Sequence, residues 1–276
     1  MHYDPTQYLG SAVHYLAGRP PYSAQLATVL AEELRLDGSG RLVDVGCGPG
    51  VLAVELASLV ADVIAVDPDA AMLHEARAHA RANNVENITF VEARAEALPE
   101  LELGPARLVT FGQSFHRTDR LPVAEAVYDL LGPGGAMALV VPDLDASPPP
   151  PSPGHPPIPD AEIQALIRFH LGEEPRSGAG LASRYGSERF EETLKRTRFG
   201  PLRTVHAPGR PDIVRGVDDV ISRYLSMSYA APHLFGDRLD AFLTDLRQLL
   251  ESSTTTGRFW DWPGDTAVII ARKPAT

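Results

Sequence analysis

Residues 43–50 read Val-Asp-Val-Gly-Cys-Gly-Pro-Gly, and this stretch decides the fold of the chain. The apolar run at 42–45 predicts a buried strand, and residues 51–60, which are rich in Ala, Leu and Val, follow with helical spacing. Three glycines at alternate positions predict a tight turn between strand and helix, because glycine accepts positive φ and lets a ligand approach the main chain. A strand, turn and helix of this kind are typical of a nucleotide-like ligand site.

The spacing of the glycines separates the cofactors that such a turn could hold. A dinucleotide-binding turn reads G-x-G-x-x-G, but Val51 stands where its third glycine would fall. The pattern here is D-x-G-x-G-x-G, which resembles the first motif of class I methyltransferases that use S-adenosylmethionine (SAM). In that family the loop contacts the amino-acid part of SAM, and an acid suits its ammonium and sulfonium groups. The resemblance implies cofactor contacts from Asp44, Gly46, Cys47, Gly48 and Gly50; a glycine-rich turn of another nucleotide fold is the alternative.

Length and charge limit the partners of the chain. Its 276 residues allow one domain with insertions, and 44% hydrophobic and 22% charged residues are ordinary for a globular protein. The formal net charge of −11 argues against nucleic acid or an anionic membrane as a partner, because phosphate binding rests on clustered Lys and Arg. Cys47 is the single cysteine, so the sequence predicts no disulfide and no cysteine metal cluster.

Two further patterns are missing from the sequence. We find no H-E-x-x-H or other metal-binding spacing, and therefore expect no metal. The N-terminus has no basic start followed by an apolar run, and no stretch reaches about 18 uninterrupted apolar residues. We therefore expect a cytoplasmic protein.

An acid follows the second predicted strand, at residues 62–66. Asp67 stands 21 residues after Gly46, at the strand end where an acid can accept hydrogen bonds from both ribose hydroxyls. The glycine loop and this acid together are far more specific than either alone. Asp67 therefore joins the predicted cofactor-binding residues.

A helix is expected directly after this strand. Pro68 fixes the exit of the chain, and residues 70–83 have helical spacing with Met72 on the inward face. Asp69 stands just ahead of the helix, where we expect it to act as the N-cap. Pro68 and Met72 complete this part of the predicted cofactor site.

The third predicted strand, 87–91, carries a second resemblance. Residues 95–99 read A-E-A-L-P, which is similar to the segment after the third strand in small-molecule SAM methyltransferases, where the loop touches the adenine. The resemblance implies that the Ala95 backbone or Glu96 meets the adenine amino group. Arg94 departs from the family, which often has Asp or a small residue there, and we expect it to be a solvated charge.

The fourth predicted strand, 107–111, ends where substrate and cofactor meet in open α/β sheets. The next residues resemble the Q-A-x-H-W-x-D stretch of methyltransferases related to trans-aconitate methyltransferase. Gln113 and Ser114 are expected at the cofactor. His116 is the candidate catalytic group, as a base or to orient the acceptor, because histidine titrates near neutral pH. Arg117 replaces the usual aromatic residue, and its charge would suit an anionic substrate.

The N-terminal segment concentrates ring and cationic side chains before a double proline. Tyr15, Arg19 and Tyr22 are expected to close a substrate pocket, although half-buried packing and a surface ion pair are the alternative roles. Before the first strand, residues 25–36 predict an amphipathic helix.

Further along, a helix at 121–131 and a strand at 136–142 complete five apolar strands that suit a parallel sheet covered on both faces. Prolines then occupy eight of the 13 residues at 147–159, which predicts a stiff tether without sheet pairing; a ligand for a proline-reading domain is the less favoured alternative. Helices are expected at 160–171, 187–196, 217–229 and 239–250, and strands at 201–206 and 266–271.

The family resemblance implies an α/β fold: a Rossmann-like, doubly wound, seven-stranded, mostly parallel sheet with the last strand antiparallel, plus helical cap insertions. We expect one domain over 1–276, with Tyr224 in the cap as a substrate residue and Trp260 and Trp262 packed on the sheet edge. The expected parts are a SAM-binding core at 37–145, a tether at 147–159, and cap segments at 1–36, 160–198 and 212–252.

The implied reaction transfers a methyl group from SAM to an oxygen, nitrogen or carbon of a small molecule, such as a carboxylate or a natural-product intermediate, and leaves S-adenosylhomocysteine (SAH). Three alternatives stay open. A SAM-binding protein of this fold could catalyse another reaction. A nucleic-acid or protein methyltransferase is disfavoured by the acidic charge and by the lack of N-P-P-Y or D-P-P-Y after the fourth strand. An NAD-dependent oxidoreductase is disfavoured by Val51.

Overall fold

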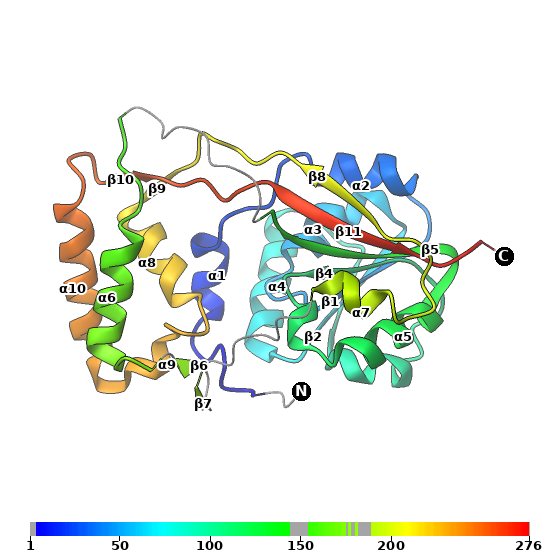
Figure 1. Cartoon of the computed structure of the whole chain (residues 1–276), viewed down its shortest axis with the longest axis horizontal. Coiled ribbons are helices and arrows are strands. Elements are labelled where there is room, and N and C mark those ends of the chain that lie inside the picture. Colours follow the sequence, from blue (N-terminus) through cyan, green and yellow to red (C-terminus); the bar gives the residue numbers. More distant parts are fainter. Residues whose placement is uncertain (1–3, 144–153, 175, 178–179, 182–188, 276) are drawn as a thin grey trace.

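A seven-stranded sheet organises the chain. The computed structural model describes residues 4–143, 154–174, 176–177, 180–181 and 189–275. The strands of the sheet lie in the order β3-β2-β1-β4-β5-β11-β8 (Figure 1). Their bounds are β1 Arg41–Val45, β2 Asp62–Asp67, β3 Ile88–Glu92, β4 Ala106–Gly112, β5 Leu131–Pro142, β8 Arg203–Ala207 and β11 Thr266–Arg272.

The direction of the strands confirms the predicted fold class. β1 pairs in parallel with β2 and β4, and the pairs β2–β3 and β4–β5 are also parallel. β11 runs antiparallel to both of its neighbours, β5 and β8. Because β11 is reversed, its first residue, Thr266, lies at the same edge of the sheet as Pro142, the last residue of β5.

Helices cover both faces of the sheet. Leu30 of α2, Leu52 of α3 and Leu73 of α4 pack in one buried cluster with sheet residues such as Leu42. On the other face, Val127 of α5 belongs to a second cluster. Strands covered on both faces read as apolar runs, which is why the sequence identified them. The bounds are α2 Leu26–Leu34, α3 Val51–Leu56, η1 Ala57–Leu59, α4 Ala70–Ala82, η2 Ala95–Glu100, η3 Phe115–Arg117, α5 Arg120–Leu130 and α7 Phe190–Leu194.

A separate group of helices, the cap, has its own hydrophobic cluster. It is built on buried residues such as Ile163, Ile221 and Phe242. Figure 1 shows these helices at one end of the molecule, with α1 (Ala12–Gly18) between them and the sheet. The cap elements are α6 Asp160–Leu171, α8 Val217–Leu225, α9 Pro232–Phe235, η4 Gly236–Arg238 and α10 Leu239–Ser252, with β9 Val214–Gly216 paired to β10 Arg258–Trp260; β6 Arg176–Ser177 and β7 Gly180–Leu181 form a further pair.

Several predicted elements differ in the structure. The N-terminal segment forms the helix α1, which was not expected. The helix predicted at 217–229 ends at Leu225, and the one predicted at 187–196 spans Phe190–Leu194, with 187–188 outside the described residues. The helix predicted at 51–60 is split into α3 and a 3-10 turn, η1.

The expectation that the proline-rich tether has no sheet pairing is wrong for its described part. Pro157 forms a bridge with Trp260, and the Trp260 N–H donates to the Pro156 carbonyl at 2.8 Å. Proline lacks an N–H but keeps its carbonyl, so it can accept at a strand edge. Trp260 therefore packs in the small β9–β10 sheet, away from the edge of the main sheet; residues 147–153 lie outside the described part.

Candidate active site

The glycine loop has the backbone conformation that its glycines predict. Gly46, Gly48 and Gly50 all have positive φ, at 67°, 53° and 78°. A Cβ on Gly46 would stand 2.5 Å from the Ser114 Cβ, whereas a Cβ on Gly48 would meet nothing within 4 Å. The Ser114 hydroxyl donates to the Val45 carbonyl at 2.6 Å, which fixes the exit of β4 against the end of β1. Packing against Ser114 thus requires a glycine at position 46, whereas Gly48 borders open space.

Asp44 of β1 presents an unsatisfied carboxylate oxygen. Its side chain is buried, and Thr110 donates to Oδ1 at 2.7 Å. Oδ2 is buried and has no partner at ordinary hydrogen-bond geometry. Burial raises the pKa of this carboxyl to about 7, against the effect of the Ala53 N–H at the start of α3, a further donor near the carboxylate that lowers its pKa. A buried acidic oxygen with an open acceptor position suits a cationic ligand group.

Asp67 connects the end of β2 to the glycine loop. Its carboxylate accepts from the Gly48 N–H at 2.8 Å and from the Asp69 N–H at 2.9 Å. Burial raises its pKa to about 6. Asp69 caps α4 as expected, accepting from the N–H groups of Ala71 and Met72. The predicted pairing of glycine loop and acid is therefore a direct contact.

A cavity of about 540 Å³ lies beside this loop, at the C-terminal edge of the parallel strands. That volume is in the range of small-molecule sites, and this edge is where α/β sheets bind ligands. The predicted residues that line it come from the loop, the N-terminal segment and the exit of β4: Asp44, Gly46, Cys47, Gly48, Tyr15, Arg19, Tyr22 and Gln113.

Other predicted site residues do not line this cavity. They are Asp67 at the end of β2, Pro68 and Met72 after it, Ala95 and Glu96 after β3, and Gly50, Ser114, His116, Arg117 and Tyr224. Glu96 accepts from the Asp119 N–H at 3.0 Å and pairs with Arg94 at 3.3 Å. The predicted roles of the site residues outside the cavity wall therefore remain predictions.

Tyr22 and Gln113 join the N-terminal segment to the exit of β4. The Tyr22 hydroxyl is hydrogen-bonded to Gln113, and burial raises the pKa of this tyrosine. Gln113 has φ 53°, a left-handed conformation that non-glycine residues rarely adopt. Such backbone strain concentrates at functional sites.

His116 and Arg117 lie in the 3-10 turn η3. Burial and the nearby Arg117, Arg120 and Arg19 lower the pKa of His116 to about 3, so its imidazole is neutral at physiological pH. The Arg117 guanidinium stacks over the Tyr8 ring at 4.8 Å. Arg117, which replaces the aromatic residue usual in the family, is thus held by the Tyr8 ring.

Tyr224 lies in the core of the cap. Only 1% of its surface is exposed, and its hydroxyl donates to Asp160 Oδ1. The family resemblance implied a pocket residue, whereas the helical spacing of this segment favours a core position, and the structure places the side chain in the core.

Some residues of the cavity wall were not predicted from the sequence. Arg215, Met227, Asp265 and Thr266 line it, and so does His79, whose Nδ1 lies 3.2 Å from the Pro49 carbonyl. The reversed direction of the last strand was a usable signal, because it brings the start of that strand to the ligand edge. Arg215 carried no such signal, since cap packing decides its position.

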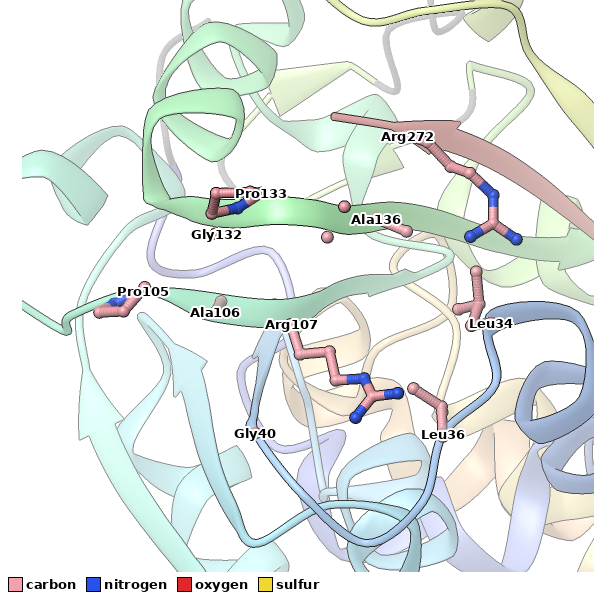
Figure 2. Close-up of a pocket in the computed structure, with 12 residues that line it drawn as sticks. Leu34, Leu36, Gly40, Pro105, Ala106, Arg107, Gly132, Pro133, Ala136 and Arg272 are labelled. Carbon is pink, nitrogen blue, oxygen red and sulfur yellow. The ribbon is translucent and has the colours of Figure 1, made fainter. Parts of the chain in front are cut away.

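A second cavity, of about 440 Å³, lies at the opposite ends of the strands, where β4 and β5 begin (Figure 2). Arg107 and Arg272 line it, but both guanidinium groups already have partners. Arg107 pairs with Asp37 and donates to Ser39, and Arg272 donates to the Glu33 carbonyl at 2.6 Å and pairs with the Glu33 carboxylate. This cavity has no comparable ligand groups.

Two kinds of feature are absent from the described residues. They contain no group of three His, Cys, Asp or Glu side chains placed to hold a metal ion. None of the helices in the described ranges has the length and apolar character that a membrane span needs.

Sequence comparison identifies the core of the site. The protein family described as "Methyltransferase domain" matches residues 42–135, from β1 into β5. The ubiquinone biosynthesis O-methyltransferase of Acinetobacter baumannii (strain AYE) is 35% identical over 96 residues, or 34% of this chain and 40% of that protein. An uncharacterized RNA methyltransferase of Thermosynechococcus vestitus is 43% identical over 72 residues, or 26% of this chain and 16% of that protein. The chain thus spans two fifths or less of the length of these relatives.

A solved structure extends the likeness to the whole fold. The [4+2]-cyclase SpnF matches with a TM-score of 0.53 at 17% identity, over 98% of this chain and 93% of that chain. At this level of identity the likeness concerns the fold alone.

Proposed function

Because residues 42–135 form a class I SAM-dependent methyltransferase domain, we propose that the protein transfers a methyl group from SAM to a small-molecule acceptor. The observation that carries the proposal is the open oxygen of Asp44 beside the glycine loop, on the wall of a cavity that Tyr15 and Tyr22 also line. A cationic cofactor group at Asp44 would leave the tyrosine side of the cavity for an acceptor.

The residues present fit SAM. Asp44 Oδ2 would accept from the ammonium, and the open space at Gly48 would let the amino-acid part of SAM come against the backbone. Asp67, already at the loop, is the candidate for the ribose hydroxyls. SAM supplies a methyl group that is activated by the positive sulfur and needs no further activation by the protein.

The main task of the chain is then to align two reactants in a dry site. Alignment of this kind is worth up to roughly 7 to 11 kcal/mol of the barrier. Tyr15 and Tyr22 supply ring surfaces for the acceptor, and the C-terminal stretch at Asp265 and Thr266 closes the same wall. A general base is needed only where the acceptor must lose a proton.

We propose that His116 orients the acceptor, because a pKa lowered to about 3 makes its imidazole a weak proton acceptor near neutral pH. With its pKa lowered to about 3, the imidazole stays neutral from pH 6 to 9 and its contribution does not change over that range. We expect His116→Ala to reduce the turnover number by about 100-fold, equally across this range, and His116→Gln, which keeps a hydrogen-bonding side chain, to lose less. Unchanged turnover of His116→Ala from pH 6 to 9 would remove His116 from the mechanism.

Support for a small-molecule acceptor comes from the cavity beside the glycine loop, the net charge of −11 and the O-methyltransferase relatives. The RNA methyltransferase relative shares only a core segment, and clustered basic residues are the usual requirement for RNA. The cyclase that shares the fold is the reason to keep non-methylating chemistry as the second candidate.

Calorimetric titration with SAM and SAH, followed by a methyl-transfer screen against small carboxylic acids and phenols, tests the proposal. We expect both cofactor forms to bind and SAH to accumulate only when an acceptor is present. Binding without transfer to any acceptor favours the second candidate, and absence of binding overturns the proposal.

A further inference from the structure

The peptide unit between Pro49 and Gly50, in the glycine loop, is held at both of its ends. The Gly50 N–H donates to the Cys47 carbonyl at 3.0 Å. The Pro49 carbonyl, on the other side of the same peptide, lies 3.2 Å from Nδ1 of His79 in α4. A carbonyl oxygen can only accept, so His79 Nδ1 is the donor of this hydrogen bond. A side chain from a neighbouring helix therefore helps to fix the loop.

The helix α4 approaches the loop along one face. Ala76 and His79 are three residues apart in this helix, so their side chains share a face. A Cβ on Gly50 would stand 3.2 Å from the Ala76 Cβ, so the helix and the loop are already in close packing there. His79 is half-buried and also lines the cavity beside the loop. Its ring thus reaches both the loop and the ligand space.

The glycines on both sides of Pro49 make this hydrogen bond important. Gly48 and Gly50 have φ 53° and 78°, and glycine keeps more backbone freedom than any other residue. Gly48 borders the open space in which the amino-acid part of SAM would lie, so a reoriented peptide at Pro49 would reshape that wall. A hydrogen bond that holds the loop before the ligand arrives reduces the ordering cost of binding.

We propose that His79 is a positioning residue for the cofactor: its Nδ1–H donates to the Pro49 carbonyl and holds the glycine loop in the shape that receives the amino-acid part of SAM. This role rests on the proposed function for the identity of the ligand. It assigns the effect of His79 to one ring nitrogen, Nδ1, and to the loop, and not to a direct contact between the imidazole and the ligand.

Substitution by asparagine and by glutamine separates the two ring nitrogens. The amide nitrogen of asparagine lies near the place of Nδ1, and that of glutamine near the place of Nε2. We expect His79→Asn to bind SAH within about twofold of the wild type, and His79→Gln to bind it roughly 5- to 10-fold more weakly, because the Pro49 carbonyl then loses its donor. Calorimetric titration with SAH measures both affinities.

A second histidine in α4 provides the matched control. His74 is exposed and lies outside the cavity wall, so His74→Asn and His74→Gln should both bind SAH as the wild type does. A role of the His79 ring in packing alone would weaken SAH binding equally in His79→Asn and His79→Gln. The difference between these two variants is therefore the readout that a packing role does not produce.

The ring of His79 in the wild-type protein gives a test that needs no variant. Nitrogen NMR of the imidazole shows which of its two nitrogens carries a proton, and the tautomer follows the hydrogen bond that the ring makes. We expect Nδ1 to be protonated both in the empty protein and with SAH bound.

Three results would overturn the role of His79: equal SAH affinity of His79→Asn and His79→Gln, weaker binding by His79→Asn than by His79→Gln, or an unprotonated Nδ1 in the wild type. Weaker binding by the asparagine variant would assign a direct ligand contact to Nε2 instead. Failure of the wild type to bind SAH is a different result, because it removes the proposed function itself.

Discussion

Gly46 and Gly48 share a left-handed backbone but differ in their surroundings. We expect Gly46→Ala to destabilise the fold strongly, because its Cβ would lie 2.5 Å from the Ser114 Cβ. Gly48→Ala carries only the backbone strain, about 1 to 2 kcal/mol, but places a methyl group in the open space beside the loop. Thermal melting and SAH titration separate the two: the first should melt early, and the second should stay folded and bind SAH weakly. A Gly46→Ala variant that melts like the wild type contradicts this packing.

The carboxyl of Asp44 makes a pH dependence testable. Its raised pKa of about 7 means that the empty site holds a proton below that pH, and this proton must leave before a cation can bind. Affinity for SAH should therefore rise as the pH increases from 6 to 7 and level off above 7, with a limiting slope of about tenfold per pH unit well below the pKa. Calorimetry in buffers of different ionisation enthalpy measures the released proton. Asp44→Asn should bind SAH weakly and release no proton from this position. A variant that kept the pH profile of the wild type would contradict the assignment of that profile to Asp44.

At this scale the sequence predicts groups whose position follows from a neighbouring turn. Asp44, the glycines, Asp67 and the Asp69 cap are each fixed by the strand or helix beside them. Tyr224 shows the limit, because a helical position does not reveal whether the side chain faces a core or a pocket. Arg215 reaches the cavity through long-range packing that no local pattern encodes.

At the scale of elements, α1 and α8 pack closely through Gly18. A Cβ there would stand 2.3 Å from the Ser222 backbone, so Gly18→Ala must separate the two helices. Gly→Ala within a helix usually stabilises by about 1 kcal/mol, so we expect the opposite sign here: a lower melting temperature and weaker ligand binding. Ala17→Gly, at the exposed neighbour, is the matched control and should cost about 1 kcal/mol or less. Stabilisation by Gly18→Ala would contradict the close packing.

The strands were predictable as elements because each is an apolar run bounded by turns. The helix α1 was not, since its seven residues sit before a double proline and are stabilised by contact with α8. The bridge at Pro157 was also not predictable. The high proline content shows that backbone N–H donors are missing from the segment, but it does not show whether the remaining carbonyls accept hydrogen bonds from a strand.

At the scale of the whole molecule, the buried Asp261 joins the cap to the N-terminal segment. It pairs with Arg215 at 2.8 Å and with Arg223 at 2.7 Å. Asp261→Asn would leave two arginines without their carboxylate, and we expect a loss of about 3 to 5 kcal/mol in the free energy of unfolding. Urea denaturation measures this. Arg210→Gln, which breaks an exposed pair with Asp212, is the control and should have no measurable effect; an equal effect of both variants would refute a special role for the cluster.

The general fold was predictable from alternating strands and helices, whereas the cap was not. Its helices have clear apolar faces, but their arrangement depends on which faces meet, and several different packings would satisfy the same pattern. The cofactor side of the site is therefore specified by local sequence, and the acceptor side by tertiary contacts.

Titration of the intact protein with SAH is the most direct test of SAM-dependent chemistry at this site. We expect one SAH molecule to bind per chain and Asp44→Asn to weaken that binding, because the open carboxylate oxygen then loses its charge. No binding of SAH to the wild type, or equal binding to both proteins, would contradict a cofactor site at Asp44 and the glycine loop.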